Sequence, residues 1–242
     1  MNKYYEIKVS VYLENNIYSK DMYDKQANLI NYSFNSSQIL SCLHKRKGFK
    51  HYSFSGLYPV EKDYIYKADE IYNFLFRTYK EDIADEFIRV IQKTKNDDFV
   101  VTDVSLRIWQ HKEINYVDNI TPTVITLKDG IRWNKDTHGI EIAKESVFKN
   151  LVKKYNSLNN TNFKFRYDDI IKDIEVKSKC AIVVNYKNIQ VLGYKLRISY
   201  KDNSIAQEIA NLSVVEGIGE KNSSFGMGFV KPYFKGRLEC AK

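Results

Sequence analysis

Apolar and polar residues follow two kinds of spacing along the first half of the chain. Residues 4–14 (YYEIKVSVYLE) alternate as a strand does, because successive side chains of a strand point to opposite faces. Across residues 23–42 the apolar positions recur at helical spacing. Asn35-Ser36-Ser37 can break or recap that helix, since these side chains compete for backbone hydrogen bonds. The pattern predicts a strand followed by an interrupted helix.

The next segments complete a recognisable order of elements. Residues 50–60 predict a strand that ends at Pro59, and 63–77 predict extended or mixed structure. Residues 81–94 have acids in the first turn and cations in the last, as a helix dipole favours, and 99–111 alternate as a strand. The order strand–helix–strand–strand–helix–strand is the ferredoxin-like pattern.

The second half repeats this order in outline. It predicts a strand near 122–128, a helix near 144–158, a hairpin of 174–186 against 189–200 joined at Lys187-Asn188, a helix near 204–213 and a strand near 228–234. We therefore predict an α+β fold of two tandem ferredoxin-like (RRM-like) βαββαβ domains. The domains are expected at 1–115 and 116–242, joined around 112–121.

Composition is that of a globular protein. Of 242 residues, 43% are hydrophobic and 28% charged, and no apolar run approaches the roughly 18 residues of a membrane span. The N-terminus alternates polar and apolar residues and does not resemble a secretory signal. Cys42, Cys180 and Cys240 are odd in number and widely spaced, which favours free thiols in a reducing compartment. A cytoplasmic location is expected.

Positive charge changes the picture because it is concentrated. The chain carries a formal charge of +8, together with 19 Tyr and 13 Phe, which fits a nucleic-acid binder. The stretches between Asp24 and Glu61, between Glu175 and Asp202, and between Glu220 and Glu239 contain no acidic residue. Structural surfaces usually mix both signs, so these stretches favour a phosphate-binding surface. Among their cations are Lys45, Arg46, Lys47, Lys177, Lys179, Arg197 and Lys221.

A glycine-rich loop lies near the C-terminus. Four of the ten glycines (Gly217, Gly219, Gly226 and Gly228) form two Gly-x-Gly pairs within residues 217–228. Glycine permits positive φ and close approach of backbone N–H groups to an anion. Lys221, Asn222, Ser223 and Ser224 lie between the pairs. The order of elements excludes a dinucleotide fingerprint, and the spacing is not that of a Walker A motif.

A second motif, residues 43–50 (LHKRKGFK), surrounds a histidine with cations. His44 has four cations and no carboxylate within the following six residues. Imidazole moves protons near neutral pH, and the cations would hold a phosphate beside it. The three other histidines, His51, His111 and His138, carry no such signal.

Together, Leu-His-x-x-x-Gly-x-Lys and the doubled glycine loop resemble the CRISPR-associated repeat-RNA processing endoribonucleases of the RAMP superfamily. The resemblance implies a metal-independent enzyme that cuts precursor RNA once per repeat, leaving a 5′ hydroxyl and a 2′,3′-cyclic phosphate. It implies His44 as general acid or base, Lys50 as stabiliser of transition-state charge, and Tyr32 as a further catalytic residue. The expected partner is CRISPR repeat RNA, with no cofactor, metal or membrane. Membership of an effector complex, and the choice between monomer and homodimer, stay open.

Two other functions remain open from the sequence. One is a non-catalytic RNA-binding subunit of the same fold that carries guide RNA in an effector complex. The other is an enzyme that binds a nucleotide or small anion on the glycine loop. The residues expected to contact RNA are the cations named above, from Lys45 to Lys221, together with Gly217, Gly219, Asn222, Ser223, Ser224, Gly226 and Gly228.

Overall fold

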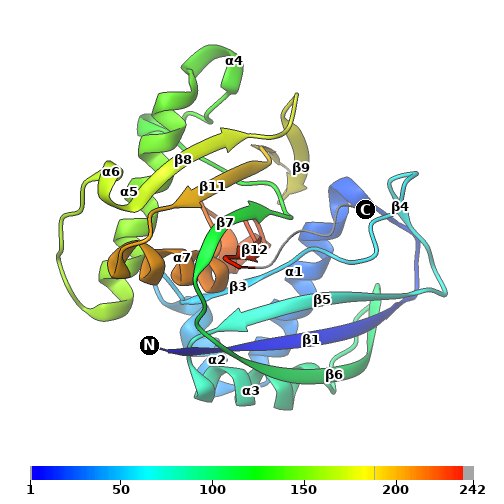
Figure 1. The fold of residues 1–242 in the computed structure, drawn as a ribbon. Helices are drawn as coiled ribbons and strands as arrows, with labels where there is room; N and C mark the ends of the chain where they lie inside the picture. Colours follow the sequence, from blue (N-terminus) through cyan, green and yellow to red (C-terminus); the bar gives the residue numbers. More distant parts are fainter. Residues whose placement is uncertain (1, 188, 237–242) are drawn as a thin grey trace.

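The computed structural model describes residues 2–187 and 189–236, and its first half is a sheet covered by helices on one face (Figure 1). All neighbouring strands are antiparallel. The strand order is β3 (Tyr52–Phe54), β5 (Ile71–Thr78), β1 (Lys3–Leu13), β6 (Phe99–Gln110). The covering helices are α1 (Ser19–Asn35), α2 (Gln38–Lys45) and α3 (Glu81–Ile91).

A second antiparallel sheet lies in the other half. Its order is β12 (Val230–Phe234), β7 (Ile114–Asn119), β11 (Leu196–Tyr200), β8 (Ile171–Val176). Helices α5 (Ile140–Asn159) and α7 (Ser204–Glu216) connect its strands. In both sheets the first and third strands of the βαββαβ order are central and the second and fourth are at the edges. The predicted α+β fold of two ferredoxin-like units is confirmed.

Short elements complete the chain. They are the ribbon β2 (Ile17–Tyr18) and β4 (Ile65–Tyr66), the hairpin β9 (Ile182–Tyr186) and β10 (Ile189–Gly193), η1 (Lys128–Gly130), α4 (Lys135–His138), α6 (Tyr167–Ile170) and α8 (Asn222–Phe225). The predicted long hairpin is confirmed in two pieces, because β8 pairs with β11 and β9 with β10. Asn188 at its tip, and Cys240, lie outside the described residues.

The predicted helix interruption is also confirmed. Helix α1 ends at Asn35, and Ser37 caps α2 by accepting the Leu40 N–H at 3.2 Å. The side chain of a cap residue satisfies a backbone donor that the first turn leaves free. Helix α2 therefore starts as a separate helix, and it carries His44 in its last turn.

One predicted strand is wrong. Residues 122–128 are outside the sheet, whereas β7 occupies Ile114–Asn119, inside the stretch expected to join the domains. Pro122 has no N–H for a ladder, and Thr123, Val124 and Thr126 form only isolated bridges to loops. The predicted division between residues 115 and 116 stays a prediction.

The second half also packs on the first. Val184 and Val191 of the β9–β10 hairpin, and Phe225 and Met227 of the glycine-rich loop, belong to the same hydrophobic core as the first sheet. Burying such side chains stabilises by about 1.5–3 kcal/mol each. The hairpin and the loop are therefore fixed against the helical side of the first half.

Buried polar contacts join the two sheets as well. Arg77 of β5 donates to Glu6 at 2.7 Å and to the carbonyls of Val214 and Val230 at 3.0 and 2.8 Å. His51 contacts Glu216 through Nδ1 at 2.8 Å. A charge buried in this way needs such partners. In the described part of the chain, no helix has the length and apolar character to cross a membrane.

Candidate active site and nucleic-acid interface

Helix α2 places His44 at the boundary between core and surface. The helix is anchored by Leu40 and Leu43, which are buried. The His44 and Phe34 rings meet edge to face, with centroids 6.3 Å apart. Nδ1 is buried and has no hydrogen-bond partner, which leaves Nε2 as the ring nitrogen that a substrate can reach. The imidazole is held on one side and open on the other.

Lys50 returns to the end of the same helix. Gly48, with φ of +93°, takes a left-handed conformation that turns the chain back after Lys45. The Lys50 ammonium then donates to the His44 carbonyl at 2.7 Å. That carbonyl belongs to the last turn, where carbonyls lack helical partners, so a cation is favoured there. Lys50 thus caps the helix and holds a positive charge beside the imidazole.

Burial lowers the pKa of His44 below its usual value of 6.5, and the charges of Lys50, Lys187 and Lys45 lower it further. Burial also lowers the pKa of Lys50. At neutral pH His44 is therefore mainly the neutral imidazole, the form that accepts a proton.

Lys187 is a site residue that the sequence analysis did not select. It follows β9, 143 positions after His44 in the sequence, yet it contributes to the lowered pKa of His44. The β9–β10 hairpin lies near His44 because it packs in the hydrophobic core of the first sheet. Lys187 lies in the stretch between Glu175 and Asp202 that contains no acidic residue, and this was the signal in the sequence. Only tertiary packing decides which cation of that stretch comes close to His44.

Tyr32 lies apart from this group. Its side chain is 58% exposed and lines a hollow with Glu14, Asn15, Lys95, Asn96, Asp97 and Val100. Residues two apart on a helix are separated by about 200°, and Phe34 is the residue of α1 that meets His44. The structure does not bring Tyr32 and His44 together, and a catalytic role for Tyr32 stays a prediction.

The predicted RNA-binding cations fall into two classes. Lys45, Arg46, Lys47 and Lys179 are exposed, and none belongs to an ion pair between described residues. Arg197 instead forms a two-pronged contact with Asp118, at 2.7 Å for each bond, and stacks over Tyr116. Lys177 lies 3.4 Å from Glu175. The first class offers free charge to a phosphate, whereas Arg197 is already neutralised.

The glycine-rich loop (residues 217–229) is buried over most of its length. The N–H of Ile218 donates to Gly228, that of Gly228 to Pro122 and that of Gly226 to Asn222, at 2.8, 2.8 and 3.1 Å. A Cβ on Gly228 would lie 1.9 Å from the Ile218 carbonyl, so only glycine fits. Internal bonds therefore occupy the N–H groups of Gly226 and Gly228, and contact of these glycines with RNA stays a prediction.

A buried lysine organises the loop from within. The ammonium of Lys154 in α5 lies 2.7 Å from the Gly217 carbonyl and 2.7 Å from Asn222 Oδ1, and 3.2 Å from the carbonyls of Glu216 and Gly219. Asn222 also donates to Ile218 and Met227. Burial lowers the pKa of Lys154 to about 8. Asn222, predicted to contact RNA, is turned inward, and Lys221, Ser223 and Ser224 remain nearest the surface.

The cysteines and acids suggest no further centre. Cys42 and Cys180 are free and exposed. Among the described residues, no group of three or more His, Cys, Asp or Glu side chains is arranged to hold a metal ion.

Comparisons with known proteins place the chain in a family. Residues 107–232, just over half of the chain, match the family model of the CRISPR associated protein Cas6, C-terminal. No curated protein matches the sequence. Three solved structures share the fold over 95% of this chain. A CRISPR associated protein Cas6 is 18% identical, with 99% of that chain covered and a TM-score of 0.68. An RAMP protein binding different RNA substrates is 20% identical (99% covered, TM-score 0.72), and a Cas6-related protein from Pyrococcus furiosus is 20% identical (98% covered, TM-score 0.65). The chain belongs to the Cas6 family of CRISPR repeat-RNA processing proteins.

Proposed function

We propose that this protein is an endoribonuclease that binds CRISPR repeat RNA and cleaves the precursor transcript within each repeat. The reaction is attack by the RNA's own 2′ hydroxyl, without a metal, leaving a 2′,3′-cyclic phosphate and a 5′ hydroxyl. The supporting observation is the half-buried imidazole of His44 beside Lys50, with Lys45 and Lys187 close enough to lower its pKa.

His44 suits the proton transfers of this reaction. A neutral imidazole removes the 2′ proton, and the resulting imidazolium can return a proton to the leaving 5′ oxygen. Its other ring nitrogen, Nε2, is the one available for these transfers, because Nδ1 is buried. RNA supplies the nucleophile, so the protein only has to align the 2′ oxygen with the phosphorus and the leaving group.

Lys50 and Lys187 supply the charge that the phosphate needs. The Lys50 ammonium has three donors, and one of them is used by the His44 carbonyl. The remaining donors can contact a phosphate oxygen that gains charge in the transition state. Since Lys187 comes from the other half of the chain, the proposed centre is complete only when both halves are docked.

The surrounding cations support binding of the flanking RNA. Lys45, Arg46 and Lys47 extend the charge beyond the centre, and Lys179 and Lys221 add charge from the second half. Backbone phosphates bind such lysines with a strong dependence on salt. The similar RAMP structure is described as binding different RNA substrates, which supports the same class of ligand here.

The test is cleavage of repeat RNA from the same host in excess EDTA. Wild type should cut once per repeat, and His44→Ala should lose about 10²–10⁴-fold in rate while keeping its affinity. His111→Ala is the control, because His111 lies in a separate hollow with Tyr79 and Glu208. Binding without cutting by wild type would favour the RNA-carrier function. Absence of binding at low salt, with stabilisation by mononucleotides, would favour the small-anion enzyme.

A further inference from the structure

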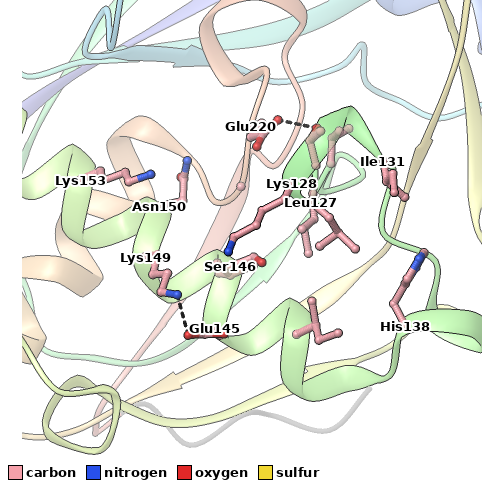
Figure 2. Close-up of a pocket in the computed structure, with 16 residues that line it drawn as sticks. Leu127, Lys128, Ile131, His138, Glu145, Ser146, Lys149, Asn150, Lys153 and Glu220 are labelled. Carbon is pink, nitrogen blue, oxygen red and sulfur yellow. Dashed lines mark hydrogen bonds and ion pairs between the residues drawn. The ribbon is translucent and has the colours of Figure 1, made fainter.

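A cavity of about 670 Å³ lies in the second half, away from His44 (Figure 2). It is bounded by the segment 124–131, by α5 and by Gly219 and Glu220 of the glycine-rich loop. Cavities that bind small organic groups typically measure about 300–1,000 Å³. A single nucleotide fits within this range. The loop thus faces the first core on one side and this cavity on the other.

Apolar side chains form the walls of the cavity. Leu127, Ile131 and Ile142 line it, and Ile131 and Ile142 are 53% and 43% exposed. Exposed aliphatic side chains that gather at a cavity indicate a ligand with an apolar surface. The faces of a nucleobase have this character.

Polar residues on one face of α5 line the same space. Glu145, Ser146, Lys149, Asn150 and Lys153 follow helical spacing and all line the cavity. The side-chain Oδ1 of Asn150 is buried and has no hydrogen-bond partner. An unpartnered buried acceptor costs free energy. A turn of the Asn150 amide about its Cβ–Cγ bond would bring Oδ1 to the amino and ring N–H donors that nucleobases carry.

The rim of the cavity carries positive charge. Lys128 and Lys153 are exposed and take part in no ion pair between described residues, and Lys149 pairs with Glu145 at 2.6 Å. Glu220, the other acid, accepts from Thr126 at 2.7 Å. Two unpaired cations beside an apolar slot complement a phosphodiester joined to a base.

We propose that this cavity binds one unstacked nucleotide of the RNA, with its base between Leu127, Ile131 and Ile142 and donating to Asn150. Lys128 and Lys153 contact the adjoining phosphates. The inference rests on the proposed binding of repeat RNA and adds a second recognition point, on the opposite side of the glycine-rich loop from the first core. It makes affinity depend on one particular base of the repeat.

The experiment combines RNA and protein changes in a His44→Ala background, so that the RNA stays intact. A series of repeat RNAs, each with one abasic nucleotide, is bound to the protein and to its Ile142→Trp, Asn150→Ala and Val60→Trp forms. Ile142→Trp fills the cavity, Asn150→Ala removes the side-chain amide, and Val60→Trp adds the same ring at an exposed site elsewhere.

We expect one abasic position to weaken binding about 5–100-fold, as loss of one stacked base does. Ile142→Trp should weaken binding of intact RNA similarly and remove the penalty at that position, whereas Val60→Trp should keep it. Asn150→Ala should reduce the loss of affinity at that abasic position. This smaller change keeps the test valid if Ile142→Trp does not fold. An equal penalty in all forms, or no abasic penalty anywhere, would overturn the inference alone. Failure to bind any repeat RNA would contradict the proposed function as well.

Discussion

The His44 segment (residues 44–50) and the glycine-rich loop (residues 217–229) look alike in sequence and differ in structure. Both combine glycine with cations in a stretch without clustered acids. In the His44 segment the charges stay unneutralised and the imidazole keeps one open nitrogen. In the loop the backbone donors are bonded internally and Lys154 binds the carbonyls. Glycine therefore allows a turn of the chain after His44, whereas in the loop it allows close packing of the backbone.

The largest expected effect is the loss of stability when the buried lysine under the glycine-rich loop is replaced. Lys154→Met removes a fully buried ammonium and leaves four acceptors without a donor, which should destabilise the fold by about 3–5 kcal/mol. Denaturant unfolding measures this. Lys153→Met, one residue away and exposed, should change stability by less than about 0.5 kcal/mol. Equal effects in both variants would mean that Lys154 does not organise the loop.

Lys50→Met should reduce the cleavage rate strongly and the stability of the fold only slightly. The proposed transition-state contact predicts a loss of about 10²–10³-fold in single-turnover cleavage rate. Stability should fall by only about 1 kcal/mol, because one half-buried hydrogen bond to a helix end is removed. A variant that unfolds readily yet cuts normally would assign Lys50 to structure alone.

The pH profile should report the charges around His44. Its lowered pKa predicts a cleavage rate that is level at neutral pH and falls as pH drops below 6.5, through that lowered pKa, when the base becomes protonated. Lys187→Ala removes a positive charge, so the pKa of His44 should rise toward 6.5 and the falling limb should move to higher pH. An unmoved limb would place Lys187 away from the histidine.

The smallest expected effect is a change in the salt dependence of RNA binding, which should differ between free cations and cations paired with an acid. Lys179→Ala should reduce the salt dependence of RNA binding by about one phosphate contact. Arg197→Ala should leave the salt dependence nearly unchanged, since Arg197 is held by Asp118. Binding is measured at several salt concentrations. The reverse ranking would place the RNA on the Arg197 face of the second sheet.

Much of the fold could be predicted because local patterns agreed with tertiary structure. The alternation in β1 and β6, and the serines between α1 and α2, have local causes and were placed correctly. The strand at 114–119 was missed because residues 122–128 have equal strand character, and only pairing with β11 and β12 decides between them.

The candidate site was predictable only in part. His44 and Lys50 are six residues apart, so one helix end brings them together. Lys154 resembles its exposed neighbour Lys153 in sequence, and its burial depends on the loop that covers it. Lys187 needs the packing of a hairpin from the other half. The acid-free stretch around Lys187 marked it only as one cation among several, because the spacing of neighbouring residues does not show long-range packing.

The most direct test of the central claim uses repeat RNA with a single 2′-deoxy nucleotide at the cleavage position. If the 2′ hydroxyl is the nucleophile and His44 its base, the wild-type protein binds this RNA with unchanged affinity, leaves it intact in EDTA and cuts the all-ribose RNA to a 2′,3′-cyclic phosphate. Cleavage of the deoxy RNA at the wild-type rate would contradict the account, because that substrate has no internal nucleophile.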